Sequence, residues 1–340
     1  MRLGVVVSCY RQERFLARTV AALERALEGE DWQGVLEFAA PSDEPLPPRS
    51  DRWRVISSFD PATRRPLRPL TPGAGRMVGF DACGGDWVLF ADSDMELDAA
   101  WVQAILATAA REPGLAGLGG RIEEWFLDGA AERPGKRDMY GTGDRDRAVG
   151  YFGNVAFYRR EALVAAGGYD VRLSSDEDFE LGMRLRWLGF ELRSLGMRAG
   201  RHWSAPRPSF PELSRRWRTG LCFGQGQVLR LYLGRRGFGT LLGRQWLYIA
   251  TLGIWSLGLA ALAAWLVSGD PGLLARWGVF VVALLAFMTV RKRGPRLAVH
   301  SLLTWTLNGL GMLVGLTWPP RAERAVDVPA PGAGGGEARC

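Results

Sequence analysis

The fold of this 340-residue chain is indicated by one stretch, which reads Asp86-Trp87-Val88-Leu89-Phe90-Ala91-Asp92-Ser93-Asp94-Met95-Glu96-Leu97-Asp98. Its four apolar residues, 87–90, predict a buried strand of a parallel sheet, and this strand runs directly into Asp92, Ser93 and Asp94. Side chains two positions apart in extended backbone share a face, so we expect Asp92 and Asp94 to point the same way. Acids at the carboxyl end of such a strand lie where open α/β sheets bind their ligands.

The paired acids have two interpretations, and their spacing alone leaves both open. Two carboxylates on one face favour a hard divalent cation such as Mg²⁺ or Mn²⁺, which takes oxygen ligands and can share them with phosphates. In the alternative interpretation the acids belong to a solvated turn, in which Asp94 caps a helix that begins near Ala99. The remainder of the chain must distinguish a metal site from a capped turn.

Strands and helices alternate around this stretch in the order that builds an α/β sheet. Apolar patterns predict strands over 3–9, 34–40, 53–58 and 114–121, and helices over 13–27, 75–83 and 99–110. This alternation predicts an α/β fold with a mostly parallel central sheet of the kind that binds nucleotides. We interpret the loop over 132–150, which is rich in charge and glycine, as a mobile lid.

Composition assigns the first part of the chain to a reducing compartment. Hydrophobic residues make up 47% of the sequence and charged residues 23%, which is enough apolar material for one or two packed domains. The apolar run after Met1 is too short for a signal peptide, so we expect this part to stay in the cytoplasm. The cysteines stand singly, without disulfide or zinc spacing, and are interpreted as packing residues: Cys9, Cys83, Cys222 and Cys340.

The last third of the chain begins with a basic segment and continues as an apolar tail. Nine arginines and one acid lie between Arg201 and Arg244, so this segment carries +8, while the whole chain carries +7. The segment has no nucleic-acid-binding motif, so we expect a lipid bilayer rather than nucleic acid as its partner. Three apolar runs follow that are long enough to cross a bilayer as helices: 246–267, 273–290 and 297–318.

These runs predict a membrane region over 234–320 with about three transmembrane helices. Basic residues precede the first run and lie between the second and third, while the link after the first run carries none, which favours a cytoplasmic position for both basic connections. The second run crosses the bilayer only if the Arg276 side chain extends to the interface between membrane and water. A buried soluble bundle is the alternative, and the lengths and flanking charges disfavour it. The final segment, 321–340, is predicted to be a disordered tail, and the chain a multi-pass protein of the inner or plasma membrane.

A second group of acids lies at the start of an expected helix. The segment 174–189 reads as a helix capped by Ser175 or Asp176, with an apolar face and a glycine stop formed by Leu181, Leu185, Leu188 and Gly189. Capping and the helix dipole explain one or two acids in a first turn. Three successive acids ending with Glu177 and Asp178 exceed that need, because each adds like-charge repulsion. A carboxylate that acts as a general base is the functional interpretation.

Together these motifs resemble the family 2 glycosyltransferases of the GT-A fold, over roughly residues 3–226. Similar segments follow one another in the family's order: 5–16, 72–79, Asp92-Ser93-Asp94, the Gly-Gly-aromatic-Asp turn of 167–170, and Glu177-Asp178. The resemblance implies a cytoplasmic GT-A-type nucleotide-sugar-binding domain over 1–233. Its nucleotide-binding half would cover about 1–112 and its acceptor half about 113–233, and an all-α transmembrane region would follow.

The resemblance also implies roles for individual residues. Asp92 and Asp94 would form a DxD motif that binds Mg²⁺ or Mn²⁺, and Asp178 would be the catalytic general base. His202 is a candidate third metal ligand, with a satisfied structural histidine as the alternative. The remaining residues to which the resemblance gives a role are Tyr10, Asp43, Arg76 and Asp92 on the donor side, and Glu177, Arg216 and Trp217 on the acceptor side.

The chain departs from the family pattern at three places. Met77 replaces the usual asparagine, and 39–43 replaces the double-Asp turn that holds the nucleotide base, which puts the identity of the base in doubt. Leu213 stands where processive polysaccharide synthases have the glutamine of a Gln-x-x-Arg-Trp motif. This last departure disfavours processive synthesis.

The implied function is the transfer of a sugar, with inversion, from a UDP- or GDP-sugar to a hydroxyl of a glycan or lipid-linked acceptor, as in the synthesis of cell envelope polysaccharide. Three alternatives stay open. A polyprenyl-phosphate glycosyltransferase has an acceptor that is already anionic and needs no base, and a polysaccharide synthase would need processivity. The third alternative is a catalytically inactive, membrane-tethered sugar-binding protein, which would have the fold but would not transfer the sugar.

Overall fold

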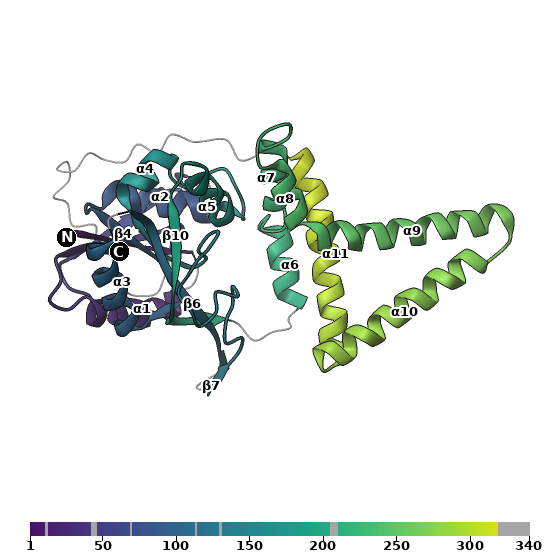
Figure 1. Cartoon of the computed structure of the whole chain (residues 1–340), viewed down its shortest axis with the longest axis horizontal. Coiled ribbons are helices and arrows are strands. Elements are labelled where there is room, and N and C mark those ends of the chain that lie inside the picture. Colours follow the sequence, from purple (N-terminus) through teal and green to yellow (C-terminus); the bar gives the residue numbers. More distant parts are fainter. Residues whose placement is uncertain are drawn as a thin grey trace. The chain divides into compact units, whose positions relative to one another are not determined.

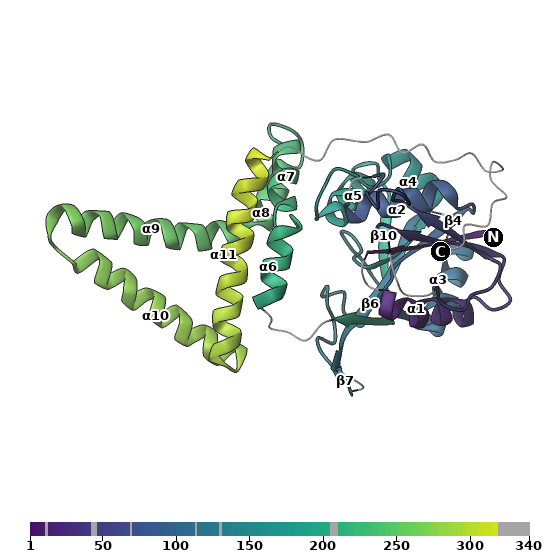
Figure 2. The same ribbon diagram turned by 180° about the vertical axis from the view of Figure 1, so that it is seen from behind.

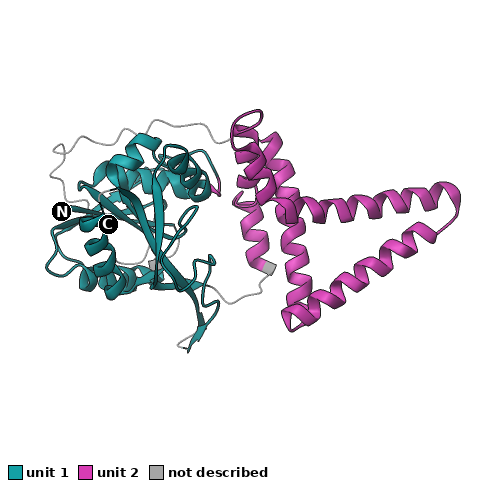
Figure 3. Cartoon of the chain, viewed as in Figure 1, with its two compact units in different colours: residues 1–173, 177–206, 321–340 teal, residues 174–176, 207–320 magenta. Residues whose placement is uncertain are grey.

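The chain forms two compact units, which are shown in Figure 3. The structure is a computed structural model, and it describes residues 1–10, 13–41, 46–68, 70–112, 114–128, 131–204 and 210–318. Unit 1 comprises Met1–Leu173 and Glu177–Pro206, and unit 2 comprises Ser174–Asp176 and Arg207–Pro320. The expected disordered tail, 321–340, lies outside the described residues.

Unit 1 is built on one mixed sheet with the strand order β3-β2-β1-β4-β9-β6-β10-β5. The strands are β1 (Leu3–Cys9), β2 (Trp32–Phe38), β3 (Trp53–Ser57), β4 (Trp87–Asp92), β5 (Met95–Leu97), β6 (Leu115–Asp128), β9 (Val155–Arg159) and β10 (Glu191–Ser204), with β7 (Ala131–Pro134) and β8 (Arg147–Ala148) off this path. The first four strands of the order pair in parallel, as the sequence predicts. The second half is mixed, because β9 enters between β4 and β6 without a crossover helix and is antiparallel to both.

Helices cover both faces of this sheet, as Figure 1 shows. The helices of unit 1 are α1 (Glu13–Ala26), α2 (Pro72–Ala82), α3 (Ala99–Arg111), α4 (Arg160–Ala166) and α5 (Glu177–Trp187). Successive side chains of a strand point to opposite faces. Val5 of β1 accordingly packs in the core layer that contains α1 and α3, while Val6 packs in the layer that contains α2, α4 and α5. The two layers fix the sheet from both sides.

Side-chain caps define where α2 and α3 begin. The Thr71 side chain accepts a hydrogen bond from the Ala74 amide, and Pro72 occupies the first turn of α2. The Asp98 carboxylate accepts a bond from the Ala100 amide at the start of α3. The interpretation of Asp94 as the cap of this helix is therefore wrong, because the cap is the acid directly before the helix.

Unit 2 is entirely helical among the residues that the structure describes. Its helices are α6 (Phe210–Arg218), α7 (Gly224–Leu231), α8 (Phe238–Arg244), α9 (Trp246–Ser268), α10 (Gly272–Lys292) and α11 (Pro295–Thr317). The last three are long and apolar enough to cross a membrane, and they lie at the positions that the sequence predicts. Figure 2, seen from behind, shows α9 and α10 meeting at one end, with α11 joining their other ends.

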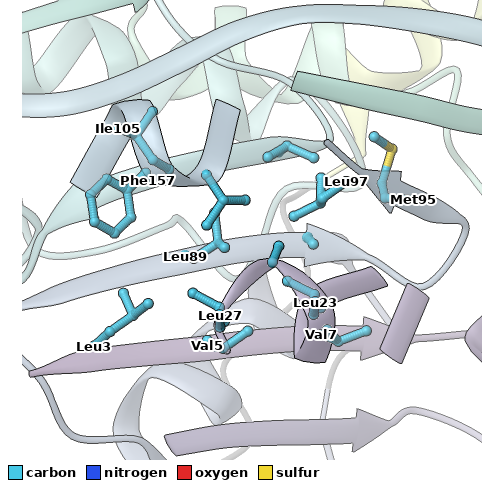
Figure 4. Close-up of a cluster of buried hydrophobic side chains, with 14 of the residues drawn as sticks. Leu3, Val5, Val7, Leu23, Leu27, Leu89, Met95, Leu97, Ile105 and Phe157 are labelled. Carbon is cyan, nitrogen blue, oxygen red and sulfur yellow. The ribbon is translucent and has the colours of Figure 1, made fainter. Parts of the chain in front are cut away.

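We expect the substitution Leu89→Ala to destabilise unit 1. Figure 4 shows the Leu89 side chain pointing from β4 toward Ile105 and Phe157, and it is fully buried. The resulting cavity should lower the free energy of unfolding by about 2 to 5 kcal/mol. Urea unfolding of the full chain in detergent measures this change.

The matched control is Leu188→Ala, because the Leu188 side chain is 53% exposed. This substitution should change the free energy of unfolding by no more than about 0.5 kcal/mol. Equal losses for the two variants would contradict the position of β4 at the centre of the core.

Candidate active site

Three strands place polar residues in one row at the carboxyl edge of the sheet. Glu37 of β2 and Asp92 of β4 both lie opposite Ser8 of β1 in the parallel register. Tyr10 follows β1 at the same edge. Asp43, the candidate for contacting the nucleotide base, lies outside the described residues. The row is at the position where open α/β sheets bind ligands.

Arg76 of α2 joins the end of β4 to the start of α5. One of its terminal nitrogens, Nη2, lies 3.0 Å from Asp92 Oδ1. The other, Nη1, lies 2.8 Å from Glu177 Oε1 and 3.0 Å from Asp178 Oδ1. The guanidinium also lies 5.2 Å from the centre of the Tyr169 ring, within the range of a cation–π contact. A single buried side chain therefore brings together the donor-side acid and the candidate base.

The charges in this cluster act strongly on one another. Burial disfavours the charged guanidinium, but the carboxylates of Asp178 and Asp92 raise the pKa of Arg76 well above its ordinary value. Burial raises the pKa of Asp92, because the opposing effect of Arg76 is smaller and Asp94 adds to the rise. The site is therefore a partly buried acidic cluster organised around one permanent positive charge.

Asp94 and His202 come together near Asp92. Asp94 Oδ2 lies 3.2 Å from His202 Nε2, and His202 Nδ1 lies 2.9 Å from the Ser204 hydroxyl. The backbone fixes this pairing, because the Trp203 amide donates to the Asp94 carbonyl. β4 ends at Asp92, so Asp94 lies in a turn, and the alternation of a strand does not set its direction as expected.

The donor set of this region fits a divalent cation. Two carboxylates and an imidazole suit Mn²⁺, and the carboxylates suit Mg²⁺. Among the described residues, no three acids, histidines or cysteines are already arranged to hold an ion. Asp92 instead bonds Arg76, while Asp94 bonds His202. A cation would thus compete with Arg76 for the first carboxylate.

The two expected caps of α5 bond elsewhere. The Ser175 hydroxyl donates to the Leu221 carbonyl, and the Asp176 carboxylate accepts a bond from the Gln245 side chain, all within unit 2. The capping predictions for Ser175 and Asp176 are therefore wrong. Arg216 and Trp217, the other acceptor-side candidates, lie on α6 in unit 2.

Sequence analysis missed a buried ion pair in the row of polar residues. Glu37 accepts bonds from Arg68 Nε at 2.8 Å and from the Ser8 hydroxyl at 2.7 Å, and the side chains of Glu37 and Arg68 are buried. A lone acid inside the apolar strand Val35-Leu36-Glu37-Phe38 was the signal for this pair. The pair holds the ends of β1 and β2 next to the start of α2.

Sequence analysis also gave no sign of a hydrogen-bonded pair beside Asp92, formed by Tyr140 and Asn154. The Tyr140 hydroxyl donates to the Asn154 side chain, and the Asp92 amide donates to the Asn154 carbonyl at 3.1 Å. Burial and the carboxylates of Asp178 and Asp92 raise the pKa of the Tyr140 phenol. The carboxylate of Asp138 holds the turn that carries Tyr140, since it accepts bonds from three of the turn's amides. The loop interpreted as a lid thus has an organised turn beside the acidic cluster.

The fold and this site define a class of protein. A parallel nucleotide-binding half, acids at the end of its central strand, and a mixed second half with acids at a helix start are typical of GT-A glycosyltransferases. Residues 55–165 match the profile of the family described as Glycosyl transferase family 2. Residues 55–165 of unit 1 are therefore similar to the family 2 glycosyltransferases, as the sequence motifs predict. A comparison with curated proteins finds no match.

Solved structures are similar to this chain at low sequence identity. The mannosyltransferase PcManGT from Pyrobaculum calidifontis, in complex with GDP-Man and Mn²⁺, is 14% identical with a TM-score of 0.58, and the match covers 93% of this chain and 87% of that one. The S. aureus protein TarS, as its 1–349 fragment, is 16% identical with a TM-score of 0.46 over 68% of this chain. This second match spans 64% of the TarS fragment.

We expect Arg76→Met to destabilise unit 1 strongly. The variant leaves Asp92, Glu177 and Asp178 without their shared guanidinium in a site where the arginine side chain is only 6% exposed. Removing one partner of a buried ion pair should lower the free energy of unfolding by about 3 to 5 kcal/mol. Urea unfolding of the full chain in detergent measures the loss.

A surface arginine supplies the control for this prediction. Arg198 pairs with Asp98, and its side chain is 39% exposed, so Arg198→Met should cost no more than about 1 kcal/mol. If Arg76→Met and Arg198→Met proved equally stable, Arg76 would not organise the cluster.

Proposed function

We propose that this chain transfers a sugar from a UDP- or GDP-sugar to a hydroxyl group of a glycan or lipid-linked acceptor, with inversion at the anomeric carbon. The observation that carries the proposal is the bridge made by Arg76. Its guanidinium contacts Asp92 at the end of β4 and Asp178 at the start of α5, both at 3.0 Å, inside a unit whose residues 55–165 are similar to the family 2 glycosyltransferases. A donor-binding acid and a proton-accepting acid are thereby held beside one another.

In the proposed reaction, Asp178 is the general base. Its carboxylate accepts the proton of the acceptor hydroxyl, and the oxygen forms a bond to the anomeric carbon of the donor sugar. The bond from that carbon to the diphosphate oxygen breaks on the opposite face, so the configuration inverts. Arg76 holds Asp178 through Nη1, which orients the carboxylate that takes the proton.

The donor side of the proposal rests on Asp92, Asp94 and His202. These residues would hold Mg²⁺ or Mn²⁺, and such an ion would stabilise negative charge on the departing diphosphate. PcManGT, which shares the fold, was crystallised with GDP-Man and Mn²⁺. Tyr10 lies at the same edge of the sheet and would contact the nucleotide. Glu177 shares the Arg76 guanidinium with Asp178 and would help to set the position of α5 on the acceptor side.

The apolar helices of unit 2 support an acceptor at a membrane. Three helices long enough to cross a bilayer follow the basic segment that contains Arg216, Trp217 and α8. We infer that they anchor the chain in the inner or plasma membrane, with the catalytic domain in the cytoplasm. A lipid-linked acceptor in cell envelope polysaccharide synthesis would be presented at this surface.

We expect Asp178→Asn to lose sugar transfer while donor binding remains. Loss of a general base typically lowers turnover by about 10²- to 10⁴-fold. The measurement is nucleoside diphosphate release by the detergent-purified full chain from a panel of UDP- and GDP-sugars, with Mn²⁺ and with EDTA. Titration of the same variant with UDP or GDP and Mn²⁺ measures donor-side affinity, which should be unchanged.

The control for this experiment is Asp86→Asn. Asp86 lies at the opposite end of β4, where it accepts a bond from the Arg2 amide, so its loss should leave release intact. Full activity of Asp178→Asn would refute a base role and favour a polyprenyl phosphate as acceptor, which needs no base. The absence of donor binding in every condition would favour the inactive sugar-binding alternative.

We expect Asp94→Asn to weaken metal-dependent binding as well as turnover. The neutral amide is a poorer ligand for a hard cation than the carboxylate it replaces. Calorimetric titration of the full chain with Mn²⁺ plus UDP or GDP measures the loss, and Asp86→Asn is again the control. Equal Mn²⁺ affinity in the Asp94→Asn variant and the unmodified chain would place the ion elsewhere.

A further inference from the structure

The end of α11 packs directly against α7, backbone to backbone. A Cβ atom added at Gly226 of α7 would lie 2.0 Å from the Met312 carbonyl oxygen, and one added at Gly315 of α11 would lie 2.1 Å from the Phe223 carbonyl oxygen. Real Cβ atoms do not approach so closely, so only glycine permits this contact. The second half of α11 therefore lies alongside α7.

Arg230 ties the last turn of α11 to the same helix. Its guanidinium donates to the carbonyl oxygens of Leu316 and Thr317, at 3.1 and 3.0 Å. The last carbonyls of a helix have no partner within the helix, and a positive charge at this end is favourable. Phe223 and Trp318 stack beside this contact, with ring centroids 6.1 Å apart. The end of α11 is thus fixed at the level of α7.

The chain does not cross a membrane between α7 and α9. Within residues 232–245, all of which the structure describes, α8 is the only helix. Its seven residues extend about 10 Å, whereas a bilayer core is about 30 Å thick. The segment also contains Arg235, Arg236 and Arg244. The start of α9 therefore lies on the same side of the membrane as α7.

These contacts limit how many times α9, α10 and α11 together can cross the membrane. Three crossings by α9, α10 and α11 would place the end of α11 on the side opposite to α7. The contacts of Arg230, Gly226 and Gly315 require it on the same side. The number of crossings between the start of α9 and the end of α11 must therefore be even, which conflicts with the three spans that apolar runs alone predict.

The hairpin of α9 and α10 is the pair that fits the bilayer. The two helices have 23 and 21 residues and are joined by a short turn, 269–271. α11 is the least apolar and the most buried of the three. Tyr248 of α9 approaches Gly309, while Met288 of α10 packs against Ala298. These contacts are 11 residues apart on α11, or about 16 Å at 1.5 Å per residue, so α11 extends across the base of the hairpin.

The free face of α11 is an apolar stripe. Val299, Leu303, Leu310 and Leu313 recur at helical spacing and are 39–47% exposed. The opposite face contains the buried residues Asn308, Met312 and Gly315. The basic residues 291–293, at the end of α10 and just before α11, suit a lipid headgroup region.

We propose that α11 lies along the membrane surface on the side of α7, with its apolar stripe in the boundary between headgroups and acyl chains, and that only α9 and α10 cross the bilayer. A helix with one apolar and one packed face can occupy this position, with its stripe buried about 5 to 10 Å into the boundary. This topology concerns unit 2 alone and does not depend on the catalytic proposal.

The first test determines the side of the membrane on which each position lies. Single cysteines are introduced into the full chain at Arg236→Cys before α8, Asp270→Cys in the hairpin turn, and Thr317→Cys at the end of α11. The background carries Cys340→Ser, and its other cysteines, Cys9, Cys83 and Cys222, are buried and supply the blank. Intact and permeabilised cells are treated with a membrane-impermeant maleimide.

We expect Thr317→Cys and Arg236→Cys to share one labelling pattern and Asp270→Cys to show the other, where one pattern is labelling already in intact cells and the other is labelling only after permeabilisation. Labelling of Thr317→Cys together with Asp270→Cys would overturn the proposal in favour of three spans. Labelling of Asp270→Cys together with Arg236→Cys would also overturn it, because the hairpin would then not cross.

A second measurement tests the depth of α11 without relying on sidedness. Leu303 lies near the middle of α11 and Leu257 near the middle of α9, and both side chains are exposed, at 39% and 68%. Spin labels at Leu303→Cys and Leu257→Cys are compared in phosphatidylglycerol–phosphatidylcholine vesicles by their collision rates with oxygen and with a water-soluble nickel complex. The label at 257 should be deep and the label at 303 shallow. Equal depth at the bilayer centre would refute a surface position.

Discussion

The cluster of acids in unit 1 depends on one interaction, the bridge from Arg76 to three carboxylates. Without a positive charge at its centre, Asp92, Glu177 and Asp178 would repel one another in a partly buried site. Arginine suits this position because its planar guanidinium offers several donors in fixed directions. A lysine would supply charge but could not reach β4 and α5 with two separate nitrogens. The geometry of the guanidinium therefore sets the spacing of the acids.

The bridge also explains why α2 begins where it does. Thr71 and Pro72 fix the first turn, so the Arg76 side chain leaves the helix one turn later and reaches the end of β4. Nearby, the buried pair of Glu37 and Arg68 holds the adjacent strand ends. Two buried arginines thus position the same sheet edge, one through structural pairing and the other through the residues of the proposed reaction.

The sequence predicts the parallel half of the sheet well, because each element there has a local signal. The apolar runs of β1 and β4 and the acids after β4 are visible without knowledge of distant contacts. The antiparallel β9 has no such signal, since its direction depends on the strands between which it inserts. The alternative interpretation of Asp94 as the cap of α3 arises because Asp94 and Asp98, four residues apart, offer the same capping chemistry. Only the backbone path distinguishes them.

In the candidate site too, the sequence identifies residues but not the distant residues that they contact. Asp92, Asp94 and Asp178 are recognisable from motif order, yet their partners are not. Arg76 bonds Asp92 across 16 positions and Asp178 across 102, and no local pattern encodes such a contact. Tyr140 has no motif at all, and its place beside the acids results from the Asp138 turn and from Asn154. Long-range pairing is therefore what the structure adds to the sequence.

In the apolar helices α9 to α11, a long-range contact also decides on which side of a membrane a helix ends. Apolar length measures whether a helix can cross a bilayer, but it contains no information on which side the helix ends. That information lies in a contact between Arg230 and the end of α11, separated by 86 and 87 positions in the chain. Because α7 and the start of α9 are connected by a segment too short to cross, this one contact fixes the parity of all the crossings that follow. A mostly apolar helix of 23 residues can thus lie at the membrane surface when its last turn is bonded to a helix on the side from which the chain started.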